Sequence, residues 1–169
     1  MTDARDHLLD WLRDAHAMEQ QAEQMLKAQA ARIEHYPALK ARIEQHIEET
    51  LGQQQLLESC IRRLGSSPSA IKDTLGKVMA MGQAVGGMMA SDEIVKGAMA
   101  SYVFEHMEIA SYRALVAAAQ AVGDMETQRA CEQILAQEEA MAQWLQDHLA
   151  EVTQQFLVRD ETPGVNARR

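Results

Sequence analysis

Carboxylate side chains that could bind metal ions recur at interior-facing positions of the predicted helices. In the stretch from Tyr102 to Tyr112, Glu105 and Glu108 lie one helical turn apart, on the face that also carries the apolar residues. An ionised carboxylate buried without a partner costs several kcal/mol, even after the protein relaxes. This pair therefore requires either a cation or protonation.

Three further segments repeat this pattern near their midpoints. Glu19 falls on the apolar stripe of the first predicted helix, and Glu49 falls on that of the second. On the fourth, either Glu138 or Glu139 takes this position. Lysine and arginine are almost absent from these stripes, so buried salt bridges do not neutralise the glutamates. Because helix midpoints lie at similar depth in a bundle, these carboxylates predict a metal site in which two cations share ligands.

One imidazole completes the candidate ligand set. His46 precedes Glu49 by three residues and shares its helical face. The candidate metal ligands are Glu19, His46, Glu49, Glu105, Glu108, Glu138 and Glu139. Such a carboxylate-rich set favours iron or manganese, or magnesium or calcium, over zinc. We expect two divalent metal ions, with iron or manganese preferred, and oxidation of Fe(II) by O₂ or peroxide if the site is catalytic.

Other reactive side chains have structural interpretations that are at least as good. Tyr102 and Tyr112 could trap radicals or hydrogen-bond to the ligands, but packing explains both. His106 lies about 100° around the helix from Glu105 and is expected to be structural. His16 and His148 either flank their helices or orient metal ligands.

Four long helices must position these side chains. Thr2 or Asp3 suits the cap of the first, because a short polar side chain there accepts a free backbone N–H. A short connection ends at Pro37, which favours the first helical position, and the second helix runs to Leu64 before Gly65. Short connections between long helices imply antiparallel neighbours.

The second half of the chain predicts another antiparallel pair. The segment Ser91-Asp92-Glu93 caps a third helix that ends at Gly123, and Asp124 begins the fourth. Residues 66–90 are expected to form a crossover with one or two short helices. The layout is therefore two helical hairpins joined by a long connection.

Length and composition agree with one helical domain. The chain has 169 residues, only three prolines and 4% aromatic residues, and strong helix formers dominate. We predict an all-α antiparallel four-helix bundle over residues 1–158, followed by a flexible C-terminal tail over residues 159–169. The formal net charge of −9 argues against nucleic-acid binding, which needs clustered lysine and arginine, and suits the binding of cations.

The expected location is the cytoplasm. Cys60 and Cys131 form no Cys-x-x-Cys pair and are expected to be reduced and buried. The first residues are polar and lack the apolar segment of a signal peptide, and no apolar run approaches the ~20 residues of a membrane span. We therefore expect a cytoplasmic protein with no membrane partner.

The hairpin, crossover and hairpin with one central glutamate per helix resemble the ferritin-like superfamily. More narrowly, the motifs at residues 46–53, 105–112 and 138–139 resemble the YciE/YciF family of bacterial stress-associated ferritin-like proteins, over residues 5–157. This resemblance implies a ferritin-like four-helix core, a homodimer and a di-metal centre. The Glu105 and Glu108 pair also looks like the doubled carboxylate of rubrerythrin-type sites.

The sequence departs from the usual di-iron ligand pattern of that superfamily. Such sites use Glu-x-x-His on the second and fourth helices. Here Gly52 stands three residues after Glu49, and Met141 stands three residues after Glu138. His46 would replace one imidazole in reversed order, and the fourth helix offers no substitute. These departures imply weak metal binding.

Two functional hypotheses from different classes remain. The first is a ferritin-like stress-response protein whose carboxylate-rich di-metal site oxidises Fe(II) or handles peroxide. The alternative is a non-enzymatic dimeric helical-bundle protein that acts by binding a protein partner, with its glutamates protonated or bridged by water. Iron storage in a 24-subunit shell is disfavoured, because nothing in the sequence identifies the required surfaces.

Overall fold

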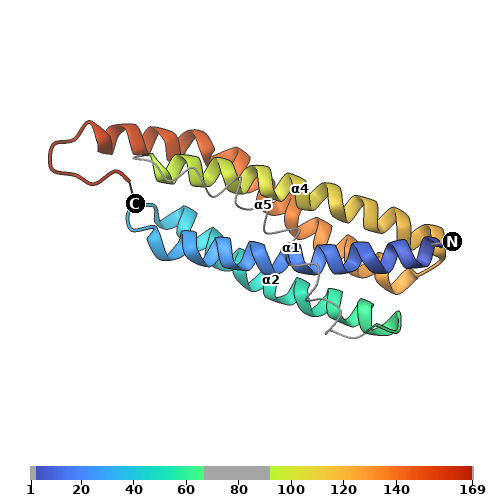
Figure 1. Ribbon diagram of the computed structural model, residues 1–169. Coiled ribbons are helices and arrows are strands. Elements are labelled where there is room, and N and C mark those ends of the chain that lie inside the picture. Colours follow the sequence, from blue (N-terminus) through green and yellow to red (C-terminus); the bar gives the residue numbers. More distant parts are fainter. Residues whose placement is uncertain (1–2, 67–91, 169) are drawn as a thin grey trace.

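A computed structural model describes residues 3–66 and 92–168, and these residues form an antiparallel bundle of four helices (Figure 1). The helices are α1 (Ala4–Arg32), α2 (Pro37–Arg63), α4 (Glu93–Val122) and α5 (Met125–Asp160). The described ranges contain no β-strand. The prediction of an all-α four-helix bundle is confirmed.

Local sequence signals account for the helix ends. The Asp3 carboxylate caps α1 by accepting hydrogen bonds from the backbone N–H groups of Arg5 and Asp6, at 2.8 and 2.9 Å. Pro37 occupies the first turn of α2. Gly65 and Gly123 follow α2 and α4 with φ of 85° and 74°, a left-handed conformation that favours glycine.

The four helices pack so that each contacts two neighbours. Helix α1 lies beside α2 and α4, and α5 lies beside α4 and α2. This order brings one face of each helix to a common interior. None of the helices in the described ranges is both long and apolar enough to cross a membrane.

The apolar interior is divided into two clusters, which a set of buried polar residues interrupts. One cluster includes Leu8, Leu12, Leu57, Leu115 and Ile134, and the other includes Ile43, Ile94, Leu145 and Val152. The buried polar residues include Glu19, His46, Thr50, Gln53, Glu105, Glu108 and Glu138. Polar groups removed from water need hydrogen bonds or charge partners. This buried polar layer is therefore the candidate functional site.

The end of the chain contacts the bundle, while the flexibility predicted for residues 159–169 remains a prediction. Helix α5 continues to Asp160, and the chain then turns back towards the connection between α1 and α2 (Figure 1). The Tyr36 hydroxyl donates to the Ala167 carbonyl at 2.6 Å, and the Arg168 guanidinium donates to Glu93 at 2.9 Å. Ala167 is consequently buried.

Part of the prediction lies outside the described residues. The structure does not describe residues 67–91, which include nearly all of the crossover predicted for residues 66–90, with its short helices, and the expected cap residue Ser91. The next residue, Asp92, holds the cap position of α4 but makes no side-chain capping bond.

Candidate metal centre

Four predicted ligands from three helices converge in the polar layer. His46 of α2, Glu105 and Glu108 of α4, and Glu138 of α5 each offer one ligand atom, and these atoms lie within 4.8 Å of one another. All four side chains are buried, with Glu138 completely inaccessible. Nitrogen and oxygen donors at this separation form the basis of a metal site.

Helical spacing explains why these side chains meet. Glu105 and Glu108 are three residues apart on α4, so both project from the same face. Buried apolar residues stand on either side of this pair along that face, including Ala98 and Leu115. Packing of this apolar face against the other helices brings the carboxylates inside with it.

His46 is the cation that holds the metal-free carboxylates together. Its Nε2 atom lies 3.2 Å from Glu105 Oε2 and 3.3 Å from Glu138 Oε2. Its Nδ1 atom lies 2.7 Å from Glu49 Oε2. Burial disfavours the charged imidazole, but the hydrogen bonds to these three carboxylates outweigh it and raise the pKa of His46 to about 12. The metal-free protein therefore contains an imidazolium between its acidic side chains.

Glu19 of α1 extends the acidic cluster, although it is not among the four converging ligands. Its side chain is fully buried, and its Oε1 accepts a hydrogen bond from the Tyr112 hydroxyl. Burial and the nearby charge of Glu138 raise the pKa of Glu19 well above its ordinary value. Tyr112 thus contacts a predicted ligand directly, whereas Tyr102 hydrogen-bonds to Gln146 on the outside.

Glu108 provides the test of whether this site suits a metal ion. Both of its carboxylate oxygens are buried, and neither has a hydrogen-bond partner among the described residues. Burial, followed by the charges of Glu19, Glu138 and Glu105, raises the pKa of Glu108 well above its ordinary value. Buried acceptors without donors are rare in native structures and need an explanation. A bound cation supplies one, so the residues present fit a divalent metal.

Glu49 does not reach the cluster centre but contacts one of the ligands, His46. Glu49 is partly exposed, accepts from Gln45 at 2.9 Å and lies 3.3 Å from Arg42. The His46 contact and these partners outweigh partial burial and lower the pKa of Glu49 to about 2. Glu49 is therefore an ionised carboxylate that orients the imidazole of His46 from outside the four-ligand cluster.

Gln53 is a functional residue that the sequence did not single out as part of the metal site. Its side chain is buried, and its amide nitrogen donates to Glu138 Oε1 and, at 3.0 Å, to Gln137 Oε1. The signal was its position on the apolar stripe of α2, seven residues after His46. Thr50, between them on the same stripe, instead donates to the backbone carbonyl of His46 at 2.9 Å.

The remaining candidates lie away from the cluster. The Glu139 side chain is 47% exposed and pairs with Arg113 at 2.9 Å, so Glu138 is the inward residue of the two. His16 is buried against Glu58 at 3.3 Å, and His106 is exposed beside the Tyr102 ring.

His148 has a structural role far from the ligands. Its ring stacks on Trp144 at a centroid distance of 4.0 Å, and its Nδ1 atom lies 2.8 Å from the Trp144 carbonyl oxygen. The polar contacts of this imidazole are therefore within its own helix, α5.

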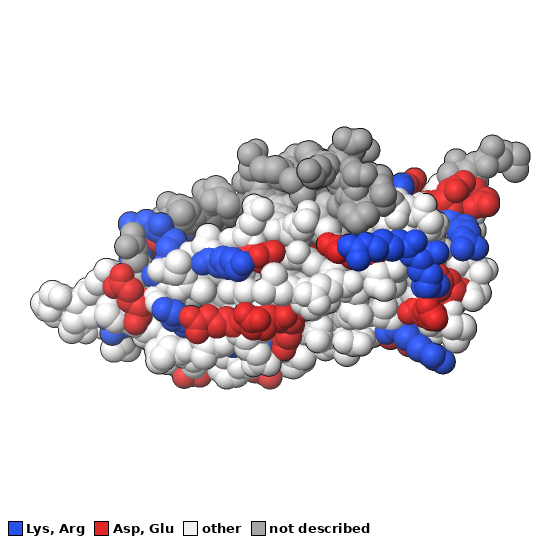
Figure 2. Space-filling view, turned by 90° about the horizontal axis from the view of Figure 1, so that it is seen from below, with Lys and Arg blue, Asp and Glu red and all other residues white. Residues whose placement is uncertain are grey.

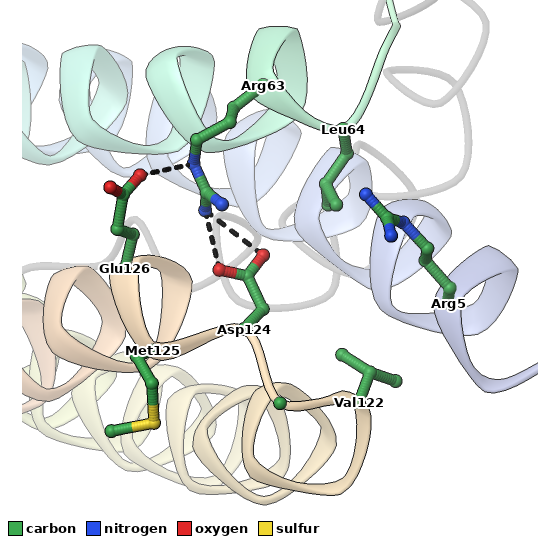
Figure 3. Close-up of a pocket in the computed structure, with 8 residues that line it drawn as sticks. Arg5, Arg63, Leu64, Val122, Asp124, Met125 and Glu126 are labelled. Atoms are coloured by element: carbon green, nitrogen blue, oxygen red, sulfur yellow. Dashed lines mark hydrogen bonds and ion pairs between the residues drawn. The ribbon is translucent and has the colours of Figure 1, made fainter.

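A separate hollow at one end of the bundle has no comparable donor set. It measures about 320 Å³ and lies where the end of α2 meets the start of α5 (Figure 3). Arg63 reaches across it to Asp124 and Glu126, each at 2.8 Å. These carboxylates neutralise the guanidinium, so the hollow contains an ion-pair connection between two helices.

Comparison with solved structures places this geometry in a known fold. A protein (XCC3681) from Xanthomonas campestris pv. campestris is 47% identical, with a TM-score of 0.80 over 94% of this chain and 99% of that chain. The E. coli stress protein YciF is 23% identical, with a TM-score of 0.70 over 89% and 97%. A dodecameric thioferritin, the bacterioferritin-related protein of Bacteroides fragilis, is 21% identical, with a TM-score of 0.70 over 90% and 89%.

The two more distant structures support the ferritin-like fold that the motifs suggest, and the narrower resemblance to the YciE/YciF family remains a prediction. The family assignment rests on the chain itself. Its residues 3–158 match the family described as a domain of unknown function (DUF892), and the protein belongs to that family.

Proposed function

We propose that this protein is a ferritin-like metal-binding protein whose buried carboxylate and imidazole cluster holds two divalent cations, iron or manganese. The observation that carries this proposal is Glu108, a buried carboxylate with no hydrogen-bond partner in the described part of the chain. Three further acidic residues, Glu19, Glu105 and Glu138, lie buried around it. One imidazolium leaves this set of charges unbalanced, and divalent cations restore the balance.

The proposed ligands are Glu19, His46, Glu105, Glu108 and Glu138. The Nε2 atom of His46 releases its proton when metal binds, because a coordinating imidazole must be neutral at the donor atom. The Nδ1 atom keeps its hydrogen bond to the Glu49 carboxylate, and this bond fixes the ring orientation. Glu139 has no part in the proposed ligand set, because its carboxylate pairs with Arg113 outside the bundle.

The proposed reaction is the oxidation of Fe(II) by O₂ or peroxide during stress. Bound iron or manganese supplies one-electron redox chemistry. The chain's own contribution is a buried site in which the Tyr112 hydroxyl donates to Glu19 and the Gln53 amide donates to Glu138. The stress role in the name of YciF is extended to this chain as part of the proposal.

Metal analysis and melting curves test the metal site directly. Protein purified without chelators should contain iron or manganese by elemental analysis. Mn(II) or Fe(II) should raise the melting temperature of the chelator-treated protein, because a ligand that binds only the native state stabilises it. Absence of metal, together with superimposable melting curves, would leave partner binding as the better hypothesis.

The proposed homodimer needs its own measurement. Trp11, Met99 and Val103 are exposed apolar residues on α1 and α4, with Val103 61% accessible. Burial of such residues in a second copy would stabilise a dimer. Light scattering of the purified protein should give twice the mass of 18.8 kDa. A monomer mass would exclude the dimer and leave the metal site untouched.

A further inference from the structure

A groove between α2 and α5 lies on the surface beside two of the helices that carry the candidate metal ligands. It measures about 510 Å³, and its walls include Glu48, Glu49 and Gly52 from α2 and Gln133 and Gln137 from α5. Its position is informative because the same two helices supply His46 and Glu138 to the cluster. An ion in the groove would therefore lie on the outer side of α2 and α5, and the proposed ligands on these two helices lie on their inner side.

Each wall of the groove is one side chain away from a ligand. On the α2 wall, Glu49 contacts the Nδ1 atom of His46 at 2.7 Å. On the α5 wall, Gln137 accepts from Gln53 at 3.0 Å, and Gln53 also donates to Glu138. The groove and the cluster are thus connected by two short chains of polar contacts, which apolar packing would have interrupted.

Gln53 separates the groove from the cluster. Its side chain is fully buried, and its amide nitrogen lies between Gln137 of the groove and Glu138 of the cluster. Its amide oxygen is buried and has no hydrogen-bond partner in the described ranges. Amide oxygens are ligands for hard divalent cations, so this oxygen can contact an ion that passes from groove to cluster.

Gly52 offers a position from which a larger side chain can be placed in the groove. It is exposed, and a Cβ atom there would meet nothing within 4 Å, so a substitution has open space beside the backbone. Glycine within a helix costs about 1 kcal/mol relative to alanine, and here the cost coincides with the wall of the groove.

Two carboxylate side chains line the groove. Glu48 is exposed, whereas Glu49 lies 3.3 Å from the Arg42 guanidinium and 2.7 Å from His46. Figure 2 views the molecule from the side on which α2 lies in Figure 1, and this face carries a row of acidic side chains together with several lysine and arginine side chains. Carboxylates concentrated along a surface raise the local concentration of cations and their association rate.

We propose that divalent cations reach the metal centre through the α2–α5 groove, with Glu48 as the exposed carboxylate that the ion meets first and Gln53 as the side chain that it passes. This inference rests on the proposed metal-binding function. It adds an access route and an outer cation-collecting position, which involve residues outside the ligand set.

The test measures loading rates separately from affinity. Co(II), whose absorption changes on binding, is mixed in excess with chelator-treated protein in a stopped-flow instrument. Gly52→Phe should slow both association and dissociation about tenfold relative to Gly52→Ala, because an obstacle of ~1.4 kcal/mol on the route raises both barriers equally. The equilibrium affinity should therefore be unchanged. Gly52→Ala controls for the gain in helix propensity.

Further variants separate the route from general effects of bulk and charge. Ala110→Phe adds the same ring to an exposed position of α4 and should leave the rates unchanged. Gln133→Trp obstructs the groove from its other wall and replaces Gly52→Phe if that variant does not fold. Glu48→Gln should slow association at low ionic strength and lose this effect at high salt.

The outcomes distinguish this inference from the proposed function. If wild-type protein binds no Co(II) at equilibrium, the proposed metal site fails. If wild-type protein binds Co(II), but Gly52→Phe and Gln133→Trp load at the rate of Gly52→Ala, the groove is not the route, while the metal site stands.

Discussion

Charge balance among five buried side chains determines the chemistry of this molecule. Four carboxylates, from Glu19, Glu105, Glu108 and Glu138, surround the single imidazole of His46 or lie beside it. One positive charge compensates one carboxylate, and burial opposes ionisation of the rest. The metal-free native state must therefore retain protons, which the proposed cations would replace.

Replacing Glu108 by glutamine tests this balance at one position. Glu108→Gln keeps the shape of the side chain but removes the carboxylate whose two oxygens lack donors. We expect the metal-dependent rise in melting temperature to disappear. The metal-free protein should gain about 1.5–3 kcal/mol of stability, the usual contribution of a hydrogen bond to a charged group, because glutamine is neutral and its amide NH2 can donate to the neighbouring carboxylates. Thermal unfolding with chelator and with Mn(II) measures both effects. A retained metal increment would remove Glu108 from the ligand set.

The role of Glu49 is tested against Glu139, because both were predicted ligands and neither reaches the cluster centre. Glu49→Ala removes the hydrogen-bond acceptor of His46 Nδ1 and should weaken Mn(II) binding about 10- to 100-fold, as loss of such orienting carboxylates does in other metal sites. Glu139→Ala should leave the affinity unchanged, because that carboxylate pairs with Arg113 outside. Titration calorimetry of the two variants and the wild type measures the Mn(II) affinities. Equal effects of the two substitutions would contradict this assignment.

The sequence predicted the buried glutamates better than their exact partners. Periodicity placed Glu19, Glu105 and Glu108 inside, because each lies among apolar residues at helical spacing. It did not separate Glu138 from Glu139, which are adjacent and both border the apolar stripe of α5. It also could not show that Glu49 lies at the edge of its stripe, because that depends on how α2 is rotated in the bundle.

At the scale of the helices, local signals and long-range contacts differ in how readily they can be predicted. The ends of α1, α2 and α4 follow from Asp3, Gly65 and Gly123, since capping involves residues close in sequence. The contact between Tyr36 and Ala167 joins residues 131 positions apart. No local sequence pattern predicts such a contact, so the composition of residues 159–169 indicated only a flexible tail.

The contact of the C-terminal segment with the bundle can be tested through one hydroxyl group. Tyr36→Phe removes the donor to the Ala167 carbonyl and should reduce stability by about 0.5–1.5 kcal/mol, the usual net contribution of a hydrogen bond. Hydrogen exchange in residues 161–168 should become faster. Tyr102→Phe is the matched control, because its hydroxyl bonds to Gln146 at the surface. Exchange that is already fast in the wild type would support the flexible tail.

The arrangement of the whole molecule was predictable only in part. Two long hairpins joined by a long crossover follow from the lengths of the apolar periodic segments. The sequence does not say that α1 lies beside α4 and that α2 lies beside α5, because either direction of crossing would bury the same stripes. That pairing creates the groove beside Glu49 and Gln137, which the sequence did not predict.

The stability of the metal-free molecule should rise as the pH falls from 8 to about 5. Glu19 and Glu108 have folded-state pKa values raised well above the ordinary 4.5, and the pKa of His46 rises from 6.5 to about 12. Between the unfolded and folded values the native state binds more protons than the unfolded chain, and acidification therefore favours the native state. Two groups act in the opposite direction. Burial lowers the pKa of His16, so acidification through 6.5 disfavours its folded form, but the groups with raised pKa values outnumber it in this range. The pKa of Glu49 falls to about 2, and its stabilisation is lost only below about pH 4.5.

Metal should remove most of this pH dependence, because cations replace the protons at the same side chains. Urea unfolding at pH 8 and pH 5.5, with chelator or with Mn(II), measures the change in the free energy of unfolding. The metal-free protein should have its higher midpoint at pH 5.5, and Glu108→Gln should reduce the difference between the two midpoints. A metal-free protein that loses stability over this range, with Glu108→Gln behaving identically, would show that the buried acidic cluster does not carry the charge balance described here.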